Sequence, residues 1–174
     1  MNIEELYYIE PVNYYICGST GSGKTWLVKK WLEEINKKNK LKLDYSGKKG
    51  VIRADLGRFP PIMDNKIVIY ENFNPRKKGI CYYGIPDLNE FLISTVFISR
   101  DNVKNTTNRV RRMFKEFRFK IIDMDKERRE NETVEQTVNR ILGIMKYPYF
   151  EFLTKEEFNN LNEKKPKAPQ IGDN

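Results

Sequence analysis

The sequence contains no histidine, only two cysteines and no long apolar run. Without histidine, Ser-His-Asp and Cys-His catalytic sites cannot form, and nearly all zinc sites with histidine ligands are excluded. Cys17 and Cys81 are too few for a secreted disulfide scaffold, and 174 residues with 39% apolar side chains can fold without such staples. We therefore expect one intracellular domain whose chemistry uses carboxylates, Lys, Arg, backbone amides or a metal ion held by oxygen atoms.

The N-terminus does not resemble a targeting signal. Residues 1–10 carry Glu4, Glu5 and Glu10, whereas a signal peptide has a basic flank and an apolar core. No window of roughly 18 apolar residues occurs anywhere in the chain. The sequence therefore predicts no membrane span and no export signal.

Positive charge is concentrated in one segment. The chain carries 32 Lys and Arg against 24 Asp and Glu, which gives a formal net charge of +8. In residues 100–120, the basic segment, eight basic residues are balanced only by Asp101 and Glu116, so six of the eight net charges lie there. The basic residues are Arg100, Lys104, Arg109, Arg111, Arg112, Lys115, Arg118 and Lys120. Such a run can be a solvated helix face, but its arginines and interleaved phenylalanines favour contact with phosphate groups.

Two kinds of apolar pattern alternate along the chain. Short β-branched and aromatic runs predict buried strands at residues 13–17, near Ile52, and at 67–70, 95–99 and 117–123. Apolar residues three or four positions apart predict helices at 24–38 and 134–145, and shorter helices are expected at 86–92 and 107–115. Alternation of strands and helices predicts an α/β fold, a three-layer sandwich with a mainly parallel central sheet and C-terminal helices.

The C-terminal third has a different character. Thr133 with Gln136, and Thr154 with Glu157, have the spacing of capping boxes that begin two helices. We expect a core over residues 1–125, a C-terminal helical element over 126–162 that packs on the core, and a disordered tail over 163–174.

One motif is specific. Residues 18–25, the P-loop, match G-x-x-x-x-G-K-[ST] in full between an expected strand and an expected helix. Its glycines let N–H groups point at phosphates, and the following helix adds the positive end of its dipole. We expect Lys24 to reach the β- and γ-phosphates of a nucleotide and the Thr25 hydroxyl to bind Mg²⁺. The expected nucleotide-binding residues are Gly18, Ser19, Thr20, Gly21, Ser22, Gly23, Lys24 and Thr25.

Such a site also needs an acid at the end of another strand, to hold Mg²⁺ or to activate water. The best candidate is Glu71, which follows the expected strand 67–70 and precedes Asn72. Glu71 could bind the metal ion while Asn72 orients water, or it could be the catalytic base itself. Asp55 is the second candidate, and Glu71 could also be a surface acid without a role. A single carboxylate at this position is compatible with slow hydrolysis.

These motifs resemble the P-loop NTPase superfamily, and their order resembles its additional-strand (ASCE) ATPases. In that group, a later strand lies between the P-loop strand and the acidic strand and ends in a polar sensor residue. The segment 95–99 is similar to that strand, so the resemblance implies Ser99 or Arg100 as sensor. Arg109, Arg111 and Arg112 then fall where ring-forming members place an arginine finger that reaches a neighbour's γ-phosphate.

Two motor families share this compact order: viral genome-packaging ATPases related to FtsK and HerA, and the superfamily-three helicase domain of small viral Rep proteins. The early P-loop slightly favours packaging, whereas the short motif spacing favours the helicase, whose usual sensor asparagine is missing here. The resemblance implies ATP and Mg²⁺ as cofactors, a homo-oligomeric ring, and nucleic acid, DNA rather than RNA, as partner. A nucleoside or small-molecule kinase with residues 102–120 as its lid, and a nucleotide-dependent switch with little turnover, stay open as alternatives.

Overall fold

The computed structural model describes residues 4–10, 12–39, 41, 43–45, 51–54, 67–73, 94–106 and 108–163. Its elements, in chain order, are β1 Glu5–Glu10, β2 Tyr14–Cys17, α1 Lys24–Asn39, β3 Val51–Ala54, β4 Ile67–Tyr70, β5 Ser94–Ser99, the 3-10 helix η1 Val103–Asn105, α3 Asn108–Glu116, β6 Lys120–Asp123, α4 Met124–Glu127, α5 Val134–Leu142, β7 Tyr149–Leu153 and α6 Lys155–Glu163. Asp55, the expected helix at 86–92 and the tail after residue 163 lie outside the described residues.

Five strands form one parallel sheet in the order β3-β4-β5-β2-β6. β5 follows β4 in the chain and nevertheless lies between β4 and β2. Cys17 at the end of β2 is in register with Ser99 of β5 and Asp123 of β6, so these strands end together at one edge of the sheet. The parallel sheet and the inserted position of the 95–99 strand are therefore confirmed.

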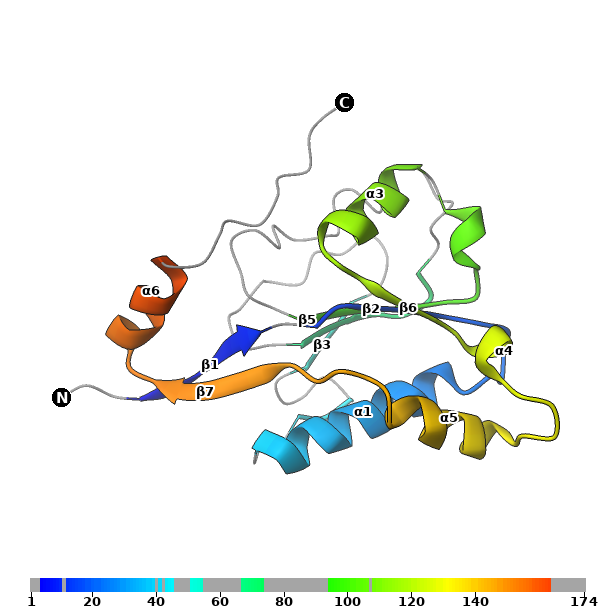
Figure 1. Cartoon of the computed structure of the whole chain (residues 1–174), viewed down its shortest axis with the longest axis horizontal. Helices are drawn as coiled ribbons and strands as arrows, with labels where there is room; N and C mark the ends of the chain where they lie inside the picture. Colours follow the sequence, from blue (N-terminus) through cyan, green and yellow to red (C-terminus); the bar gives the residue numbers. More distant parts are fainter. Residues whose placement is uncertain are drawn as a thin grey trace.

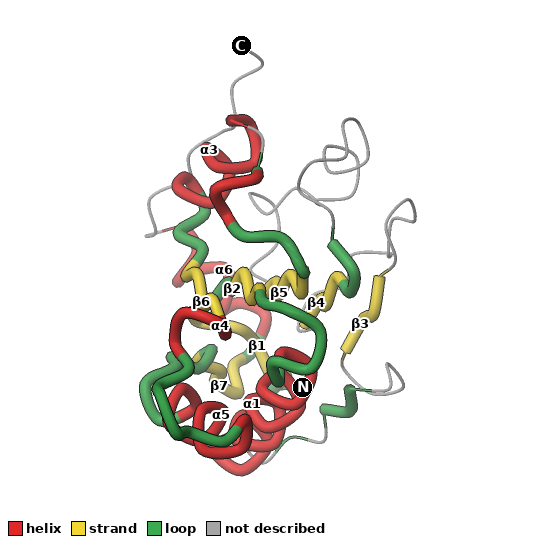
Figure 2. The backbone as a smooth tube through the Cα atoms, turned by 90° about the vertical axis from the view of Figure 1, so that its right-hand side faces the viewer, coloured by secondary structure: helices red, strands yellow, loops and turns green. Residues whose placement is uncertain are grey.

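Helices cover both faces of the sheet. Figure 2 shows α3 on one face and α1 with α5 on the other. On the α1 and α5 face, Ile16, Ile69 and Ile98 of the strands pack in one core with Leu27 and Trp31 of α1. On the α3 face the core is mostly aromatic and includes Tyr15, Tyr70, Phe73, Phe97, Phe114 and Phe119. Successive strand residues point to opposite faces, so each strand contributes to both cores.

The expected helices begin where their sequence signals place them. α1 buries Leu27, Val28, Trp31, Leu32 and Ile35, a stripe with helical spacing. At the start of α5, the Gln136 N–H donates to Thr133 Oγ1 (3.1 Å) and the Thr133 N–H donates to Gln136 Oε1 (2.9 Å). Thr154 and Glu157 make the same reciprocal pair at α6. Both capping boxes are confirmed, and Val138 and Ile141 of α5 join the core of α1.

The segment 126–162 is not helical throughout, which corrects the sequence-based expectation. β7 pairs antiparallel with β1 to form a two-stranded ribbon, visible beside the helices in Figure 1. Phe150 of β7 is buried in the core with α1, whereas Phe152 is 62% exposed. The ribbon was missed because its two strands lie at opposite ends of the sequence and β7 is only five residues long.

The expected strand over 117–123 was too long at its beginning. β6 starts at Lys120, because Phe117 and Arg118 form a turn after α3, with Arg118 at a φ of 54°. The short helix α4 was not expected either. Its N-cap is Asp123, whose side chain accepts from the Asp125 and Lys126 N–H groups.

Candidate functional site

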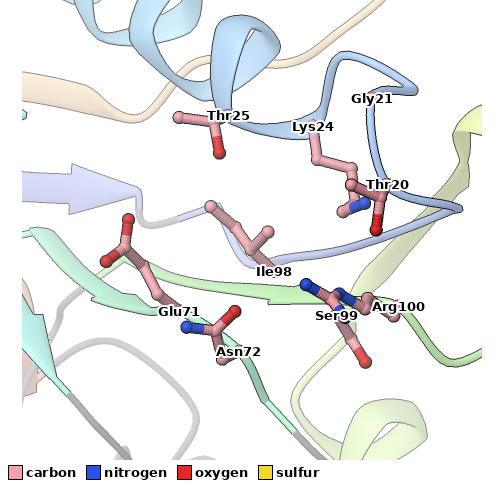
Figure 3. Close-up of a pocket in the computed structure, with 9 residues that line it drawn as sticks. All are labelled: Thr20, Gly21, Lys24, Thr25, Glu71, Asn72, Ile98, Ser99 and Arg100. Atoms are coloured by element: carbon pink, nitrogen blue, oxygen red, sulfur yellow. The ribbon is translucent and has the colours of Figure 1, made fainter.

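A hollow of about 250 Å³ lies at the edge of the sheet where β2, β4 and β5 end. In Figure 3, Lys24 and Thr25 lie on the α1 side of this P-loop hollow, and Glu71, Asn72 and Arg100 lie across from them. Its lining residues are Thr20, Gly21, Lys24, Thr25, Glu71, Asn72, Ile98, Ser99 and Arg100. Open parallel sheets bind their ligands in crevices at this edge.

The side chain of Lys24 folds back and hydrogen-bonds to the P-loop itself. Lys24 Nζ donates to the carbonyl oxygens of Gly18 (2.7 Å) and Ser19 (2.7 Å). Gly23 has a φ of 96°, and a Cβ there would lie 2.8 Å from Val134 Cγ1 and 3.0 Å from Val138 Cγ2. Glycine is thus required at this position both by the backbone conformation and by the closeness of α5. Burial lowers the pKa of Lys24; Asp125 opposes this effect and Arg100 adds to it.

The loop presents backbone donors that the protein itself does not use. In the described part of the chain, the structure records no hydrogen bond from the N–H groups of Gly21, Gly23, Lys24 or Thr25. The Ser22 hydroxyl is buried and also lacks a partner among these residues. The donors stand at the N-terminus of α1, a 16-residue helix whose dipole is positive at this end. This arrangement fits an anion such as a phosphate chain.

Thr25 and Glu71 border the same hollow and offer oxygen atoms, the donors that Mg²⁺ prefers. No group of three or more Cys, Asp or Glu residues that could hold a metal ion occurs within the described ranges. The donor set therefore fits an ion that is bound by one or two side chains together with phosphate oxygens and water. Asp55, the rival acid, is not described.

Tyr45 is a neighbour of Glu71 that the sequence did not reveal. Its hydroxyl donates a hydrogen bond to Glu71 Oε1. Asn72, next in the chain, has a left-handed φ of 52°, a conformation that asparagine tolerates better than most residues. The turn after β4 is thus shaped so that Glu71 and Asn72 both border the hollow.

The two sensor candidates have different environments. Ser99 is buried, and its hydroxyl donates to the Phe73 carbonyl (2.6 Å) and accepts from the Asp101 N–H (3.0 Å). Arg100 is exposed in the hollow, and the structure records no hydrogen bond or ion pair of its guanidinium with the described residues. Ser99 therefore supports the backbone, while Arg100 is the residue placed to contact a bound anion.

No protein-family model, curated protein or solved structure matches this chain. Its function is therefore inferred from the geometry and chemistry of the site.

Asp125 is a second supporting residue that the sequence did not reveal. The N–H and hydroxyl of Ser19 donate to Asp125 Oδ2 and Oδ1, both at 2.8 Å. Asp125 lies in α4, directly after β6, so the carboxylate ties the first turn of the P-loop to the end of a neighbouring strand. An acid two residues after the end of a strand that ends at the edge of the site is the signal that could have indicated it. Burial, together with the charges of Asp123 and Asp125, raises the pKa of the nearby Cys17 thiol to about 11.

The arginines of α3 do not reach the P-loop hollow of their own chain. α3 lies on the face of the sheet opposite α1, with Val110 and Phe114 buried against it. Arg111 is exposed and donates to the Lys104 carbonyl (2.6 Å) and to Thr106 Oγ1 (3.2 Å). Neither Arg111 nor Arg112 lines the hollow. The side chain of Arg109 is not described.

Within the described ranges, no helix is both long and apolar enough to cross a bilayer.

Proposed function

We propose that this protein binds ATP with Mg²⁺ in the P-loop hollow and hydrolyses it, as additional-strand P-loop NTPases do. The observation that carries the proposal is the insertion of β5 between β2 and β4. This order brings the P-loop, Glu71 and Arg100, which come from three different strand ends, to one hollow. The unused N–H groups of the loop support a phosphate ligand.

Each residue has a role that follows from its place. Lys24 and the loop N–H groups bind the phosphate chain, and the Thr25 hydroxyl and Glu71 hold the metal ion. Mg²⁺, when bound, neutralises charge on the phosphate oxygens and polarises the terminal phosphate. Asn72 orients the attacking water; in the alternative role, Glu71 is itself the catalytic base and accepts the proton of that water. Arg100 stabilises negative charge on the terminal phosphate from the side of the hollow across from Lys24.

The proposed motor acts on nucleic acid, DNA rather than RNA, and works as a homo-oligomeric ring. The basic segment supports this because its helix α3 buries one apolar face and leaves Arg111 and Lys115 exposed. Since Arg111 and Arg112 do not reach their own P-loop, a role as arginine finger requires a neighbouring subunit. Among motors whose motifs follow one another in this order along the chain, we favour a viral-type genome-packaging ATPase over a Rep-like superfamily-three helicase.

A small-molecule kinase is the second candidate, and one observation favours it. A hollow of about 620 Å³ borders Thr25 and Glu71, and Arg100 is not among the residues that line it. It is lined by Thr25, Lys29, Leu32, Glu33, Leu43, Asp44, Tyr45 and Glu71. A hydroxyl of a small molecule held there would lie beside the proposed phosphate and the Glu71 carboxylate.

ATP hydrolysis with and without added nucleic acid separates these functions. We expect the wild type to hydrolyse ATP faster when DNA is added, and Arg111→Ala or Arg112→Ala to lose that stimulation while still binding ATP. Arg129→Ala is the control, because Arg129 is an exposed arginine outside the basic segment, after β6 and α4. ATPase activity indifferent to every nucleic acid would contradict the motor. Phosphate transfer to a metabolite would establish the kinase, and tight binding without turnover, unchanged in Glu71→Gln, would establish a switch.

A further inference from the structure

Leu41, Leu43 and Tyr45, which follow α1 in the chain, are held against that helix. Asn36 Nδ2 donates to the Leu43 carbonyl (2.9 Å), and the Leu43 N–H donates back to Asn36 Oδ1 (2.7 Å). The Leu41 N–H donates to the Asn36 carbonyl (3.1 Å). The side chains of Leu41, Leu43 and Tyr45 pack on the core of α1. One asparagine of α1 thus holds this segment in a defined place.

Tyr45 stands at the end of this segment and contacts the acid of the site. Its hydroxyl donates to Glu71 Oε1, and Lys29 Nζ of α1 lies 5.1 Å from the centroid of its ring. A cation at that distance over an aromatic face is attracted to the ring. Tyr45 is therefore held from α1 by Lys29 and by the packing of its own segment, while its hydroxyl reaches across to the turn after β4.

From these contacts we infer that Tyr45 is a positioning residue, which fixes the Glu71 carboxylate in the orientation that binds Mg²⁺. The inference rests on the proposed function. Glu71 lies on a turn after β4, and its side chain can adopt several rotamers unless a neighbour selects one. In Figure 3 its carboxylate points toward the Thr25 side of the P-loop hollow. Tyr45 lines the neighbouring hollow of about 620 Å³, which Thr25 and Glu71 also border. Carboxylate ligands of metal ions are commonly oriented by such a second hydrogen bond.

The alternative role for Tyr45 is that its hydroxyl competes with the metal ion for the Glu71 carboxylate. The two roles predict opposite changes when the hydroxyl is removed. An orienting hydroxyl makes Mg²⁺ bind more weakly after its removal, whereas a competing hydroxyl makes Mg²⁺ bind more tightly. The dependence of nucleotide binding on Mg²⁺ therefore decides between them without any measurement of turnover.

The experiment compares Tyr45→Phe with Tyr147→Phe by calorimetric titration of ATP at a series of free Mg²⁺ concentrations and in EDTA. Tyr147 is a close match, because its hydroxyl donates to the Leu142 carbonyl (3.0 Å) and Lys38 Nζ lies 5.0 Å from its ring centroid. We expect Tyr45→Phe to raise the Mg²⁺ concentration for half-maximal tight binding about tenfold or more. A tenfold change corresponds to the loss of a single strong hydrogen bond. Binding in EDTA should stay within about twofold of the wild type, because Glu71 then has no metal ion to hold. Tyr147→Phe should change neither quantity.

A second variant keeps the inference testable if Tyr45→Phe is poorly folded by circular dichroism. Asn36→Ala releases the segment that carries Tyr45 and should raise the Mg²⁺ requirement in the same direction. Asn39→Ala, which removes only a hydrogen bond to the Ile35 carbonyl within α1, should not. A Mg²⁺ requirement that is unchanged or lowered in Tyr45→Phe overturns the role of Tyr45 and leaves the proposed function standing. A wild type that binds no nucleotide overturns both the proposed function and the inference.

Discussion

Gly23 lies where the P-loop packs closely against α5, and a methyl group at this position would clash with both Val134 and Val138. Gly23→Ala should lower the free energy of unfolding by about 2–5 kcal/mol, from the positive φ together with overpacking against α5. Urea denaturation measures this directly.

Gly21→Ala is the matched control for that change. Gly21 also has a positive φ, of 79°, but nothing lies within 4 Å of the place that its added methyl group would occupy. The only cost of Gly21→Ala is the positive φ, which alanine adopts unfavourably, so we expect the free energy of unfolding to fall by about 1–2 kcal/mol. Equal losses in the two variants would show that the approach of α5 to the P-loop has no energetic importance.

At the scale of residues, the sequence could predict the groups that belong to a contiguous motif. Lys24 and Thr25 follow from the spacing of the P-loop, and Glu71 follows from its position after a short β-branched run. Tyr45 and Asp125 could not be predicted, because each acts through a contact that tertiary folding creates. Tyr45 is 26 residues from Glu71 in the chain, and Asp125 is 106 residues from Ser19.

At the scale of elements, β7 of the β1–β7 ribbon has one phenylalanine in the core and one in solvent. Phe150 is buried with α1, whereas Phe152, two residues later, is 62% exposed. Phe150→Ala should destabilise the protein by about 3–5 kcal/mol, because it leaves a cavity among packed side chains. Phe152→Ala should change stability by less than about 0.5 kcal/mol in the same denaturation experiment. Similar losses would mean that the ribbon does not pack as described.

The loop between α4 and α5 is held by an ion pair that depends on pH. Arg140 and Thr137 donate to the Glu132 carboxylate, and these hydrogen bonds, with that from Arg140 the largest cause, lower the Glu132 pKa to about 2. The Glu132 pKa is lower in the folded protein than in the unfolded chain, where it is about 4.3. The ionised carboxylate therefore stabilises the folded protein above about pH 4.3, and this stabilisation is lost as the pH falls toward 2.

Glu132→Gln should therefore destabilise the protein at pH 7, and its difference from the wild type should shrink between about pH 5 and pH 3. Urea midpoints at pH 7, 4 and 3 test this. Glu130→Gln, a change at an exposed residue in the same loop, should show no such dependence. A difference that stays constant with pH would contradict the role of the Glu132 carboxylate.

Elements with strong local signals were predicted well, and elements that depend on distant partners were not. α1 and β4 have patterns that specify both type and length. The ribbon and the turn at Arg118 depend on packing against segments far away in the chain, and a five-residue aromatic run such as β7 carries too little periodicity to be recognised.

At the scale of the whole molecule, strand order brings the separate signals to one place. The parallel sheet ends its strands at a single edge, and the insertion of β5 places Arg100 between the P-loop strand and the strand of Glu71. The basic helix α3 lies on the opposite face from α1. In the proposed motor, the nucleotide hollow and the basic surface are thus separate regions of one subunit, and a neighbouring subunit is needed to bring Arg111 or Arg112 to a nucleotide.

The central claim is that the P-loop hollow binds a nucleotide through Lys24. Equilibrium titration of ATP with Mg²⁺ tests it most directly, with Lys24→Ala compared with Lys37→Ala, whose side chain is 72% exposed near the other end of α1. We predict that the wild type and Lys37→Ala bind ATP alike, and that Lys24→Ala binds at least about tenfold more weakly, because a charge-assisted contact with the phosphates is lost. Equal binding by Lys24→Ala and the wild type, or no binding by the wild type, would contradict the account.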